Sequence, residues 1–527
     1  MSAPTRPSAE AAAPADASDD PCDLGLLEAA ARLREGRLTS AALTEALLVR
    51  AEWAQARTNC FLRIDPEAAR GAAALADERL TAARAAGVDL AATQPLLGLP
   101  LAHKDMFVGT GSAAGAAGGW LPSCGSRVRE AAIALANGSA GTAEAVSATS
   151  VAPPLATVLA RLEAAGAHAI GALNMAEFAL GATGHNAAFG DCRNAWQPEH
   201  ISGGSSSGSG AAVACGATFA SLGSDTGGSV RIPAAANGVL GLKPTYGLLP
   251  RTGSMKLSPS IDTLGPFARS APDLAAVLQI VAGADGRDAL ASRRAPPDYA
   301  AALGRGVEGL RIGLPRNHFF AVATPEVRAA MERCLALLEG AGARIVEVTV
   351  PDAAPLAELS RAVVYAEATA LHASQLRTQA ARYTPQVRLR ASTGLAIPGT
   401  AYLEALRLRL PLLERFVGEV FGRCDVLHTP VLPIPVPRRD ETDVGGGAAL
   451  WEILAKLVYC TAPFNYLGLP AIAVPAGLDA RGLPLSAQFV ARPFAEATLL
   501  RVAAVQQRLL PMPLLPMPLL PVPSPTP

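Results

Sequence analysis

The stretch from Gly203 to Arg231 restricts this chain more than any other, because glycine, serine and alanine make up most of it. Two clusters of small hydroxylated residues lie in it, at residues 203–208 and 225–229. Residues 211–220 between them are apolar and rich in alanine, which predicts a buried helix running from one loop towards the other. A flexible linker does not fit, because this stretch encloses an apolar segment and continues into a strand-like run at residues 238–242.

Both clusters have the composition of a loop that presents a nucleophile. Glycine lets the backbone approach a ligand closely and adopts dihedral angles that other residues resist. Ser205 and Ser229 each follow two glycines, so each hydroxyl can lie beside several free backbone N–H groups. This combination suits a serine nucleophile with an oxyanion hole.

Lys104 lies near the end of residues 97–105, which have the pattern of a short apolar strand ending in charge. A lysine in apolar surroundings has a lowered pKa, and its neutral amine can act as a base. His103 is the alternative base beside it, but neighbouring side chains on a strand point to opposite faces. The same alternation turns the Asp105 carboxylate away from Lys104, where it can tether a neighbouring loop.

The amino-acid composition limits which classes of protein this chain can belong to. Half of the 527 residues are hydrophobic and 17% are charged, which allows a large core. Lys+Arg and Asp+Glu both total 45, and this balance gives no support for a nucleic-acid groove or an anionic membrane surface. Eight cysteines without a Cys-x-x-Cys pair indicate a reducing compartment, with no disulfide framework and no zinc site. Since no secretory signal and no long apolar span is found, we expect a cytoplasmic protein.

Strand and helix patterns alternate along the chain, which predicts an α/β layered fold. Helices are expected at residues 23–33, 40–57, 66–85, 155–165 and 325–341, with Ser40 as the N-cap of the second. Strands are expected at residues 169–173, 310–314, 344–350, 426–435 and 471–475.

Both ends of the chain differ in composition from its body. Residues 1–22 are rich in Ala, Pro, Ser and Asp, and residues 509–527 repeat a Leu-Leu-Pro unit, so both are expected to be disordered. The domain would then cover residues 23–508, with a helical preface at 23–90, and a cut after Gln507 should change little. Residues 127–151 are rich in Ala, Gly and Ser, and their role as a surface loop or a flap stays open.

Further stretches match the sequence pattern of one known protein family. They lie at residues 103–105, 174–178, 241–247, 260–266, 461–463, 468–471 and 482–484. Together with residues 203–212 and 223–234, they make the chain resemble the amidase signature family of serine hydrolases over about residues 24–508. The resemblance implies a single large α/β domain, in which a mixed central β-sheet is covered by helices on both faces.

The resemblance also implies a catalytic role for three residues. Ser229 would be the nucleophile, and Ser205 would be a bridging serine that follows a cis peptide bond and relays a proton. Lys104 would be the general base, neutral in the resting enzyme. Elementary chemistry agrees, because a serine hydroxyl needs a base to become a nucleophile, and a Ser-Lys pair is an alternative to Ser-His-Asp.

Further positions of the same motifs would support these three. The backbone N–H groups of the second cluster would form the oxyanion hole, namely those of Thr226, Gly227, Gly228 and Ser229. Three side chains would hold the loops in place, namely Ser206, Asp225 and Arg231.

Three functions are compatible with these residues. The first is hydrolysis of the carbon–nitrogen bond of a small amide, carbamate or urea-like compound through an acyl-enzyme on Ser229. The second is the glutamine-hydrolysing chain of a tRNA-dependent amidotransferase, which would need partner chains. The third treats residues 204–208 as a Gly-x-Ser-x-Gly elbow, with Ser206 as the nucleophile of an esterase and a later histidine such as His318, His372 or His428.

The expected partner is therefore a small-molecule amide, without nucleic acid or membrane. No cofactor and no metal are expected, because no His/Cys/Asp cluster has ligand spacing. A homodimer, the need for partner chains and the identity of the substrate stay open.

Overall fold

The computed structural model describes residues 20–109, 121–128, 135, 154–445 and 447–515. The expectations for residues 1–19, for most of 127–151 and for 516–527 lie outside these residues.

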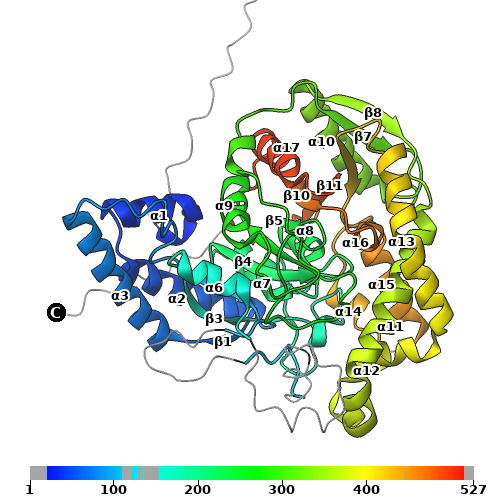
Figure 1. Ribbon diagram of the computed structural model, residues 1–527, viewed down its shortest axis with the longest axis horizontal. Coiled ribbons are helices and arrows are strands. Elements are labelled where there is room, and N and C mark those ends of the chain that lie inside the picture. The colour runs from blue at the N-terminus through cyan, green and yellow to red at the C-terminus, as the bar shows by residue number, and fades with distance from the viewer. Residues whose placement is uncertain (1–19, 110–120, 129–134, 136–153, 446, 516–527) are drawn as a thin grey trace, which may run out of the picture.

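Eight strands form one mixed sheet through the middle of the molecule (Figure 1). Their order is β4-β6-β5-β10-β11-β9-β7-β8, antiparallel from β4 to β9 and parallel from β9 to β8. The strands are β4 Ala220–Asp225, β5 Leu240–Lys243, β6 Thr263–Ala268, β7 Arg311–Pro315, β8 Arg344–Val348, β9 Val426–Pro430, β10 Ala471–Leu478 and β11 Pro484–Ala491.

A smaller sheet brings Lys104 to the edge of the large one. Its order is β1-β3-β2, with β1 Phe61–Ile64, β2 Pro100–Lys104 and β3 His168–Leu173. The N–H of Leu222 in β4 donates to Nδ1 of His103 in β2, over 3.0 Å. The end of β2, which carries Lys104, therefore lies beside the end of β4.

Helices cover both faces of the large sheet, and the strands alternate accordingly. Ile472 and Val474 of β10 lie in the same core as the apolar residues of one set of helices, which are α9 Ala271–Val281, α10 Pro325–Gly340 and α17 Glu496–Leu509. Ala473 of β10 faces the opposite core, which is formed with α7 Ser207–Ala214 and α8 Arg231–Asn237. The expected α/β fold, with a mixed sheet between helices, is confirmed.

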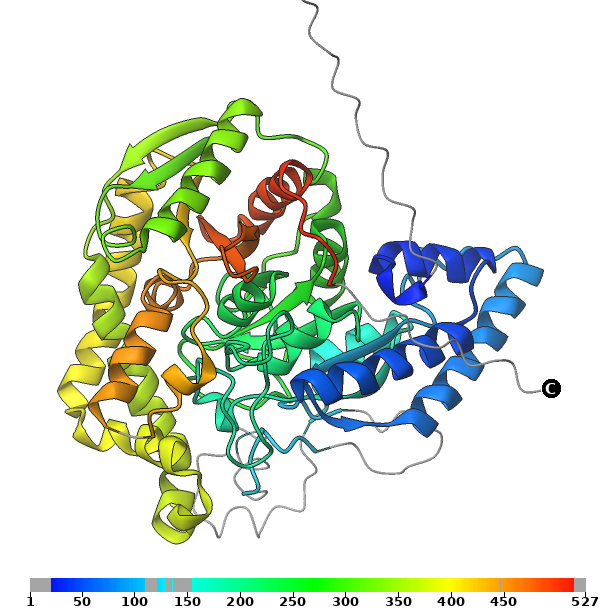
Figure 2. The same cartoon turned by 180° about the vertical axis from the view of Figure 1, so that it is seen from behind.

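Two further groups of helices lie at opposite ends of the sheet, as both views show (Figures 1 and 2). One group is α1 Leu26–Glu35, α2 Ser40–Thr58, α3 Pro66–Ala85 and α6 Thr157–Ala164. The other is α11 Ala353–Gln379, α12 Pro385–Ser392, α13 Gly399–Glu419, α14 Arg439–Thr442, α15 Ala448–Val458 and α16 Ala462–Tyr466. Short 3-10 turns are η1 Pro21–Asp23, η2 Glu177–Ala179, η3 Ala300–Ala302, η4 Ala380–Arg382 and η5 Thr393–Ala396.

Two local expectations are wrong. The N-cap of α2 is Thr39, whose hydroxyl accepts from the N–H of Ala42 over 3.1 Å, while Ser40 is already helical and donates to the carbonyl of Gly98. The helix expected at residues 211–220 is α7, which begins four residues earlier and ends at Ala214. It ends there because Gly216 adopts a φ of +67°, and the chain enters β4 at Ala220.

The C-terminal residues continue along the body beyond α17. Leu510 packs against the core, and the methyl group of Met512 lies near Gly238. Leu515 packs on a cluster that contains residues of α2 and α7. We therefore propose that the domain extends from about Asp20 to Leu515, slightly beyond the expected limits at 23 and 508.

Within the part of the chain that the structure covers, each helix is too short or too polar to cross a membrane.

Candidate active site

Lys104 and Ser205 meet in a fully buried site. Lys104 Nζ lies 2.7 Å from Ser205 Oγ and 2.9 Å from Ser224 Oγ, and donates to both. The three residues come from the end of β2, from the loop before α7 and from β4. The peptide bond between Gly204 and Ser205 is cis.

The electrostatic setting favours a neutral lysine. Burial lowers the pKa of Lys104 to about 7, although the carboxylates of Asp262 and Asp225 act in the opposite direction. His103 is not an alternative base, because burial lowers its pKa to about 3 and its Nδ1 accepts from β4. Asp105 points away as expected, and its Oδ2 accepts from the N–H of Ser123 over 2.9 Å and from the Ser123 hydroxyl.

Ser229 lies at the surface of the same site. Its carbonyl accepts from the N–H of Ser206 over 3.3 Å, which ties the two serine loops together. Its side chain is half-buried and lines a cavity, whereas Ser205 and Lys104 are fully buried behind it. In the described part of the chain, no hydrogen bond joins the Ser229 hydroxyl to Ser205.

The four backbone N–H groups of the expected oxyanion hole differ in their partners. The N–H of Gly228 donates to Asp225 Oδ1 over 2.8 Å. The N–H groups of Thr226, Gly227 and Ser229 donate to no acceptor among the described residues. These three N–H groups form the proposed hole.

A buried ion pair shapes the loop that carries Ser229. Arg231 donates to both oxygens of Asp225, and both side chains are fully buried. Burial alone would raise the pKa of Asp225, but the charge and hydrogen bonds of Arg231 hold it below its ordinary value. Asp225 also accepts from the N–H groups of Gly228 and Val230. The pair thus fixes the turn from which the Ser229 hydroxyl projects.

The hydroxyl of Ser206 is bonded to β4, and Ser206 does not line the cavity beside Ser229. Its hydroxyl donates to the carbonyl of Ser224 and accepts from the N–H of the same residue. The histidines of the esterase alternative have other surroundings: His318 stacks on a tyrosine, His372 bonds to another, and His428 is buried beside Phe489. The arrangement that this alternative requires is absent from the described residues.

Sequence patterns alone did not reveal several polar partners of this site. Ser224 accepts from Lys104, and Asp262 accepts from the Thr226 hydroxyl over 2.6 Å. Two distant side chains, Asn465 and Gln488, bind the guanidinium of Arg231. Ser224 and Asp262 lie inside the stretches that match the family pattern. The sequence signal that could have identified them is a polar residue at or next to the end of a strand. Nothing in the sequence marks Asn465 or Gln488 as partners of Arg231.

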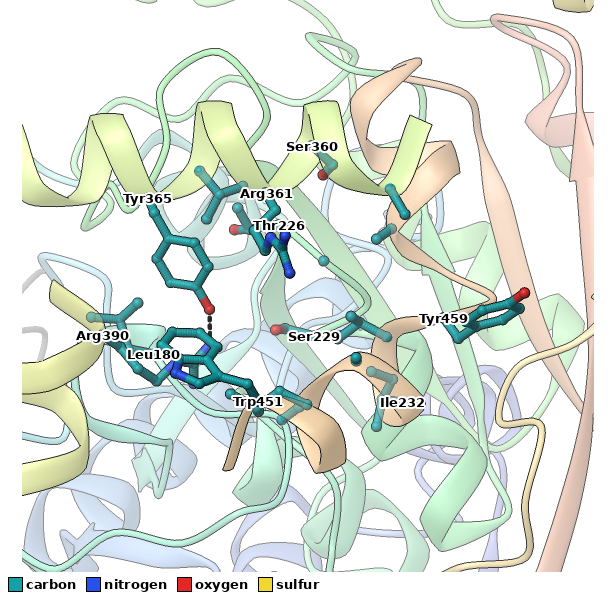
Figure 3. Close-up of a pocket in the computed structure, with 18 of the residues that line it drawn as sticks. Leu180, Thr226, Ser229, Ile232, Ser360, Arg361, Tyr365, Arg390, Trp451 and Tyr459 are labelled. Carbon is teal, nitrogen blue, oxygen red and sulfur yellow. Dashed lines mark hydrogen bonds between the residues drawn. The ribbon is translucent and has the colours of Figure 1, made fainter. Parts of the chain in front are cut away.

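Ser229 opens into a cavity of about 320 Å³, a size within the range of small-molecule sites. Most of its lining is apolar, and its aromatic, polar and charged side chains are Thr226, Ser229, His318, Glu358, Ser360, Arg361, Tyr365, Arg390, Trp451 and Tyr459. Figure 3 shows the Ser229 hydroxyl directed towards the side where Leu180, Trp451 and Arg390 lie. Arg390 donates to the Tyr365 hydroxyl over 3.1 Å, and the rings of Tyr365 and Trp451 are perpendicular.

No group of three or more His, Cys, Asp or Glu side chains in the described ranges has the spacing to hold a metal ion.

Comparisons with known proteins show which proteins the chain is similar to. A family model described as Amidase matches residues 133–500. A curated relative is the A chain of the glutamyl-tRNA(Gln) amidotransferase of Roseiflexus sp. (strain RS-1). It is 37% identical over 509 residues, which cover 92% of this chain and 96% of that protein.

Two solved structures have the same fold. One belongs to a vestigial complex described as revealing the evolutionary origins of an s-triazine catabolic enzyme. It is 31% identical with a TM-score of 0.79, and the match covers 92% of this chain and 98% of that one. The other is described as an amidase, and is 32% identical with a TM-score of 0.75 over 92% of this chain and 99% of that one.

Proposed function

The chain belongs to the amidase signature family, whose enzymes act on carbon–nitrogen bonds, and we propose that it hydrolyses a carboxamide through an acyl-enzyme on Ser229. The observation that carries this proposal is the contact of 2.7 Å between a fully buried Lys104 and Ser205. This contact supplies a neutral base and a relay next to a serine that faces a cavity.

The reaction would begin with attack of Ser229 Oγ on the amide carbonyl. The hydroxyl proton passes to Ser205, whose own proton passes to Lys104. The negative charge of the tetrahedral intermediate is held by the N–H groups of Thr226, Gly227 and Ser229. The carbon–nitrogen bond then breaks as the relay returns a proton to the leaving nitrogen. Water, deprotonated by the same relay, attacks the acyl-enzyme and releases a carboxylic acid.

The leaving nitrogen must lie on the buried side of Ser229, because its proton comes from Ser205. Neither Ser205 nor Lys104 lines the cavity, so the space on that side is small. The acyl part of the substrate would then occupy the cavity. This arrangement favours primary amides, which release ammonia.

Two settings for this reaction are supported by different observations. The Roseiflexus relative carries the name of an amidotransferase chain, so this similarity favours glutamine as the substrate and a partner chain to which the ammonia passes. The cavity favours an acyl group without an ammonium group instead. Glutamine carries an ammonium group that needs an anion when it is buried, but the carboxylate in the lining, Glu358, is exposed and paired with Arg361.

Ammonia release by the purified chain decides between the two settings. The substrates are benzamide, other neutral amides, carbamates, ureas and glutamine, each tested with and without the partner chains of a glutamyl-tRNA amidotransferase. Faster hydrolysis of neutral amides by the chain alone supports the stand-alone amidase. Glutamine hydrolysis that needs the partner chains supports the amidotransferase role. The Ser229→Ala variant should be inactive in both, and activity of this variant would contradict the nucleophile assignment.

A further inference from the structure

Glu177 is a buried carboxylate, only 1% exposed, that the proposed reaction does not use. Its Oε1 accepts from Ser126 Oγ over 2.7 Å. Its Oε2 accepts from the N–H of Thr384 over 3.2 Å and from the Thr384 hydroxyl. The carboxylate therefore joins three segments that lie far apart in the sequence.

Two of these segments are walls of the cavity. Glu177 begins η2, and the residues that follow it, 179–182, line the cavity beside Ser229. Thr384 is the N-cap residue of α12, and Arg390 on the same helix lines the cavity from the other side. Arg390 in turn donates to Tyr365 of α11. The bonds of Glu177 thus fix one wall against the other.

The turn after Glu177 is held by ring contacts as well. Phe178 and Ala179 have φ angles of +50° and +59°, a left-handed conformation that is costly for residues other than glycine. The ring of Phe178 lies 4.8 Å from that of His372 and 5.3 Å from that of Tyr383, measured between centroids. These rings belong to α11 and to the segment before α12, so they hold the same two walls together.

The catalytic serine loop is held by a different contact. The N–H of Ala176 donates to the carbonyl of Ser205 over 3.1 Å, and this bond involves only backbone atoms. Lys104 and Ser229 make no hydrogen bond to Glu177 among the described residues. Loss of the Glu177 carboxylate would therefore loosen the cavity walls and leave the proton relay in place.

We propose that Glu177 is a positioning residue for the acyl part of the substrate. It acts by holding the wall at residues 179–182 and helix α12 at the separation that a bulky acyl group fills. The proposal rests on the proposed function, in which Ser229 is the nucleophile and the acyl group occupies the cavity. A reagent that fills the cavity should depend on Glu177, and a very small reagent should not.

Two sulfonyl fluorides test this directly, because each sulfonylates an activated serine and releases fluoride. Phenylmethanesulfonyl fluoride must place its ring in the cavity, whereas methanesulfonyl fluoride needs little of it. The rate of modification of Ser229 is measured by mass spectrometry of the intact protein and its peptides. For Glu177→Ala we expect a loss of about tenfold with the phenyl reagent and a change below about twofold with the methyl reagent.

The chain offers a matched control in Glu496. It is also 1% exposed, and it also accepts from the N–H and the hydroxyl of one threonine, Thr245, over 2.7 and 2.5 Å. Glu496 lies on α17 and does not line the cavity. Glu496→Ala should reduce stability but keep the ratio of the two rates. Glu177→Gln should keep the wild-type ratio of the two modification rates, because its amide can accept from Thr384 and donate to Ser126.

The possible outcomes separate the two proposals. An equal loss with both reagents in Glu177→Ala, or the same change of ratio in Glu496→Ala, would overturn the positioning role. A wild-type chain whose Ser229 reacts with neither reagent would overturn the proposed function itself. If Glu177→Ala does not fold, Thr384→Val replaces it, since it removes one of the bonds to Glu177, and an unchanged ratio would count against the proposal.

Discussion

Lys104 is surrounded by hydroxyl groups rather than by a carboxylate. Its amine donates to Ser205 and Ser224, and the nearest contributions from carboxylates are electrostatic ones, from Asp262 and Asp225. In this setting burial dominates, and the pKa falls to about 7. A carboxylate in direct contact would stabilise the ammonium form and leave no base at neutral pH. The two hydroxyls therefore suit the lysine to its proposed role.

The pH dependence of the rate follows from this pKa. Because the neutral amine is the active form, kcat/KM should rise as the pH increases through about 7 and then reach a plateau. Hydrolysis of the best amide of the panel, measured from roughly pH 5 to pH 9, checks this. A rate that falls over this range would show that a protonated group is required instead.

The relay also predicts how two substitutions combine. Lys104→Ala and Ser205→Ala should each reduce the rate by about three orders of magnitude or more, because either change interrupts the same proton path. The double variant should lose little more than the worse single variant. Steady-state rates of the three variants measure this. Losses that simply multiply would mean that the two residues act independently.

Substitution of Ser224 tests the environment of the Lys104 amine in a second way. Its Oγ accepts from Lys104, and an acceptor favours the charged form of an amine. Ser224→Ala should therefore lower the pKa of Lys104 further, so the rising limb of the pH profile moves to lower pH. The expected loss in the plateau rate is about tenfold, since the amine keeps its contact with Ser205. If the rising limb of the pH profile stays at the same pH, Ser224 does not influence the pKa of Lys104.

At the scale of elements, the turn between β4 and α8 depends on one ion pair. Asp225 ends the strand, Arg231 begins the helix, and together they close a turn that carries Ser229. The turn contains two glycines and has few side chains of its own to hold it. Buried charges are costly when a partner is missing, so this pair is sensitive to single changes.

Arg231→Met should destabilise the protein by about 3–5 kcal/mol, because it leaves Asp225 buried without its partner. Urea unfolding of the variant and the wild type measures the difference. Arg407→Met is the matched control, since Arg407 pairs with Glu404 on the exposed surface of α13. That change should leave the unfolding midpoint where it is. Equal effects of the two substitutions would show that burial of the pair does not matter.

The elements themselves were only partly predictable from the sequence. The helix at residues 66–85 was placed correctly, because its proline and its small and charged residues mark both ends. Ser207 and Gly208 belong to the first cluster, whose composition predicts a loop, yet they begin α7. A Cβ atom at Gly208 would lie 2.4 Å from the carbonyl of Cys60, so glycine is required here by close packing rather than by flexibility. Such a contact between distant segments leaves no local pattern.

At the scale of the whole molecule, the site depends on long-range contacts. Lys104 comes from the small sheet, whereas Ser229 follows the edge strand of the large one. The motifs around these residues could be recognised, so Lys104, Ser205 and Ser229 could be proposed as catalytic residues from the sequence alone. Apart from residues 179–182, much of the cavity wall comes from α11, α12 and α15, which lie more than a hundred residues beyond Ser229 along the chain and have no distinctive motif. Tyr365, Arg390 and Trp451 were therefore not predicted.

Truncation of the C-terminal segment tests where the domain ends. The proline-rich pattern predicts that a cut after Gln507 has little effect, but Leu510, Met512 and Leu515 all contact the body. Their partial burial should contribute about 3 kcal/mol. A cut after Gln507 should therefore lower the urea unfolding midpoint, while a cut after Leu515 should not. The second cut serves as the control, because it removes proline-rich sequence and spares all three contacts. If both truncated chains have the same urea unfolding midpoint, the contacts after α17 add nothing to stability. The C-terminal limit of the domain would then be residue 508.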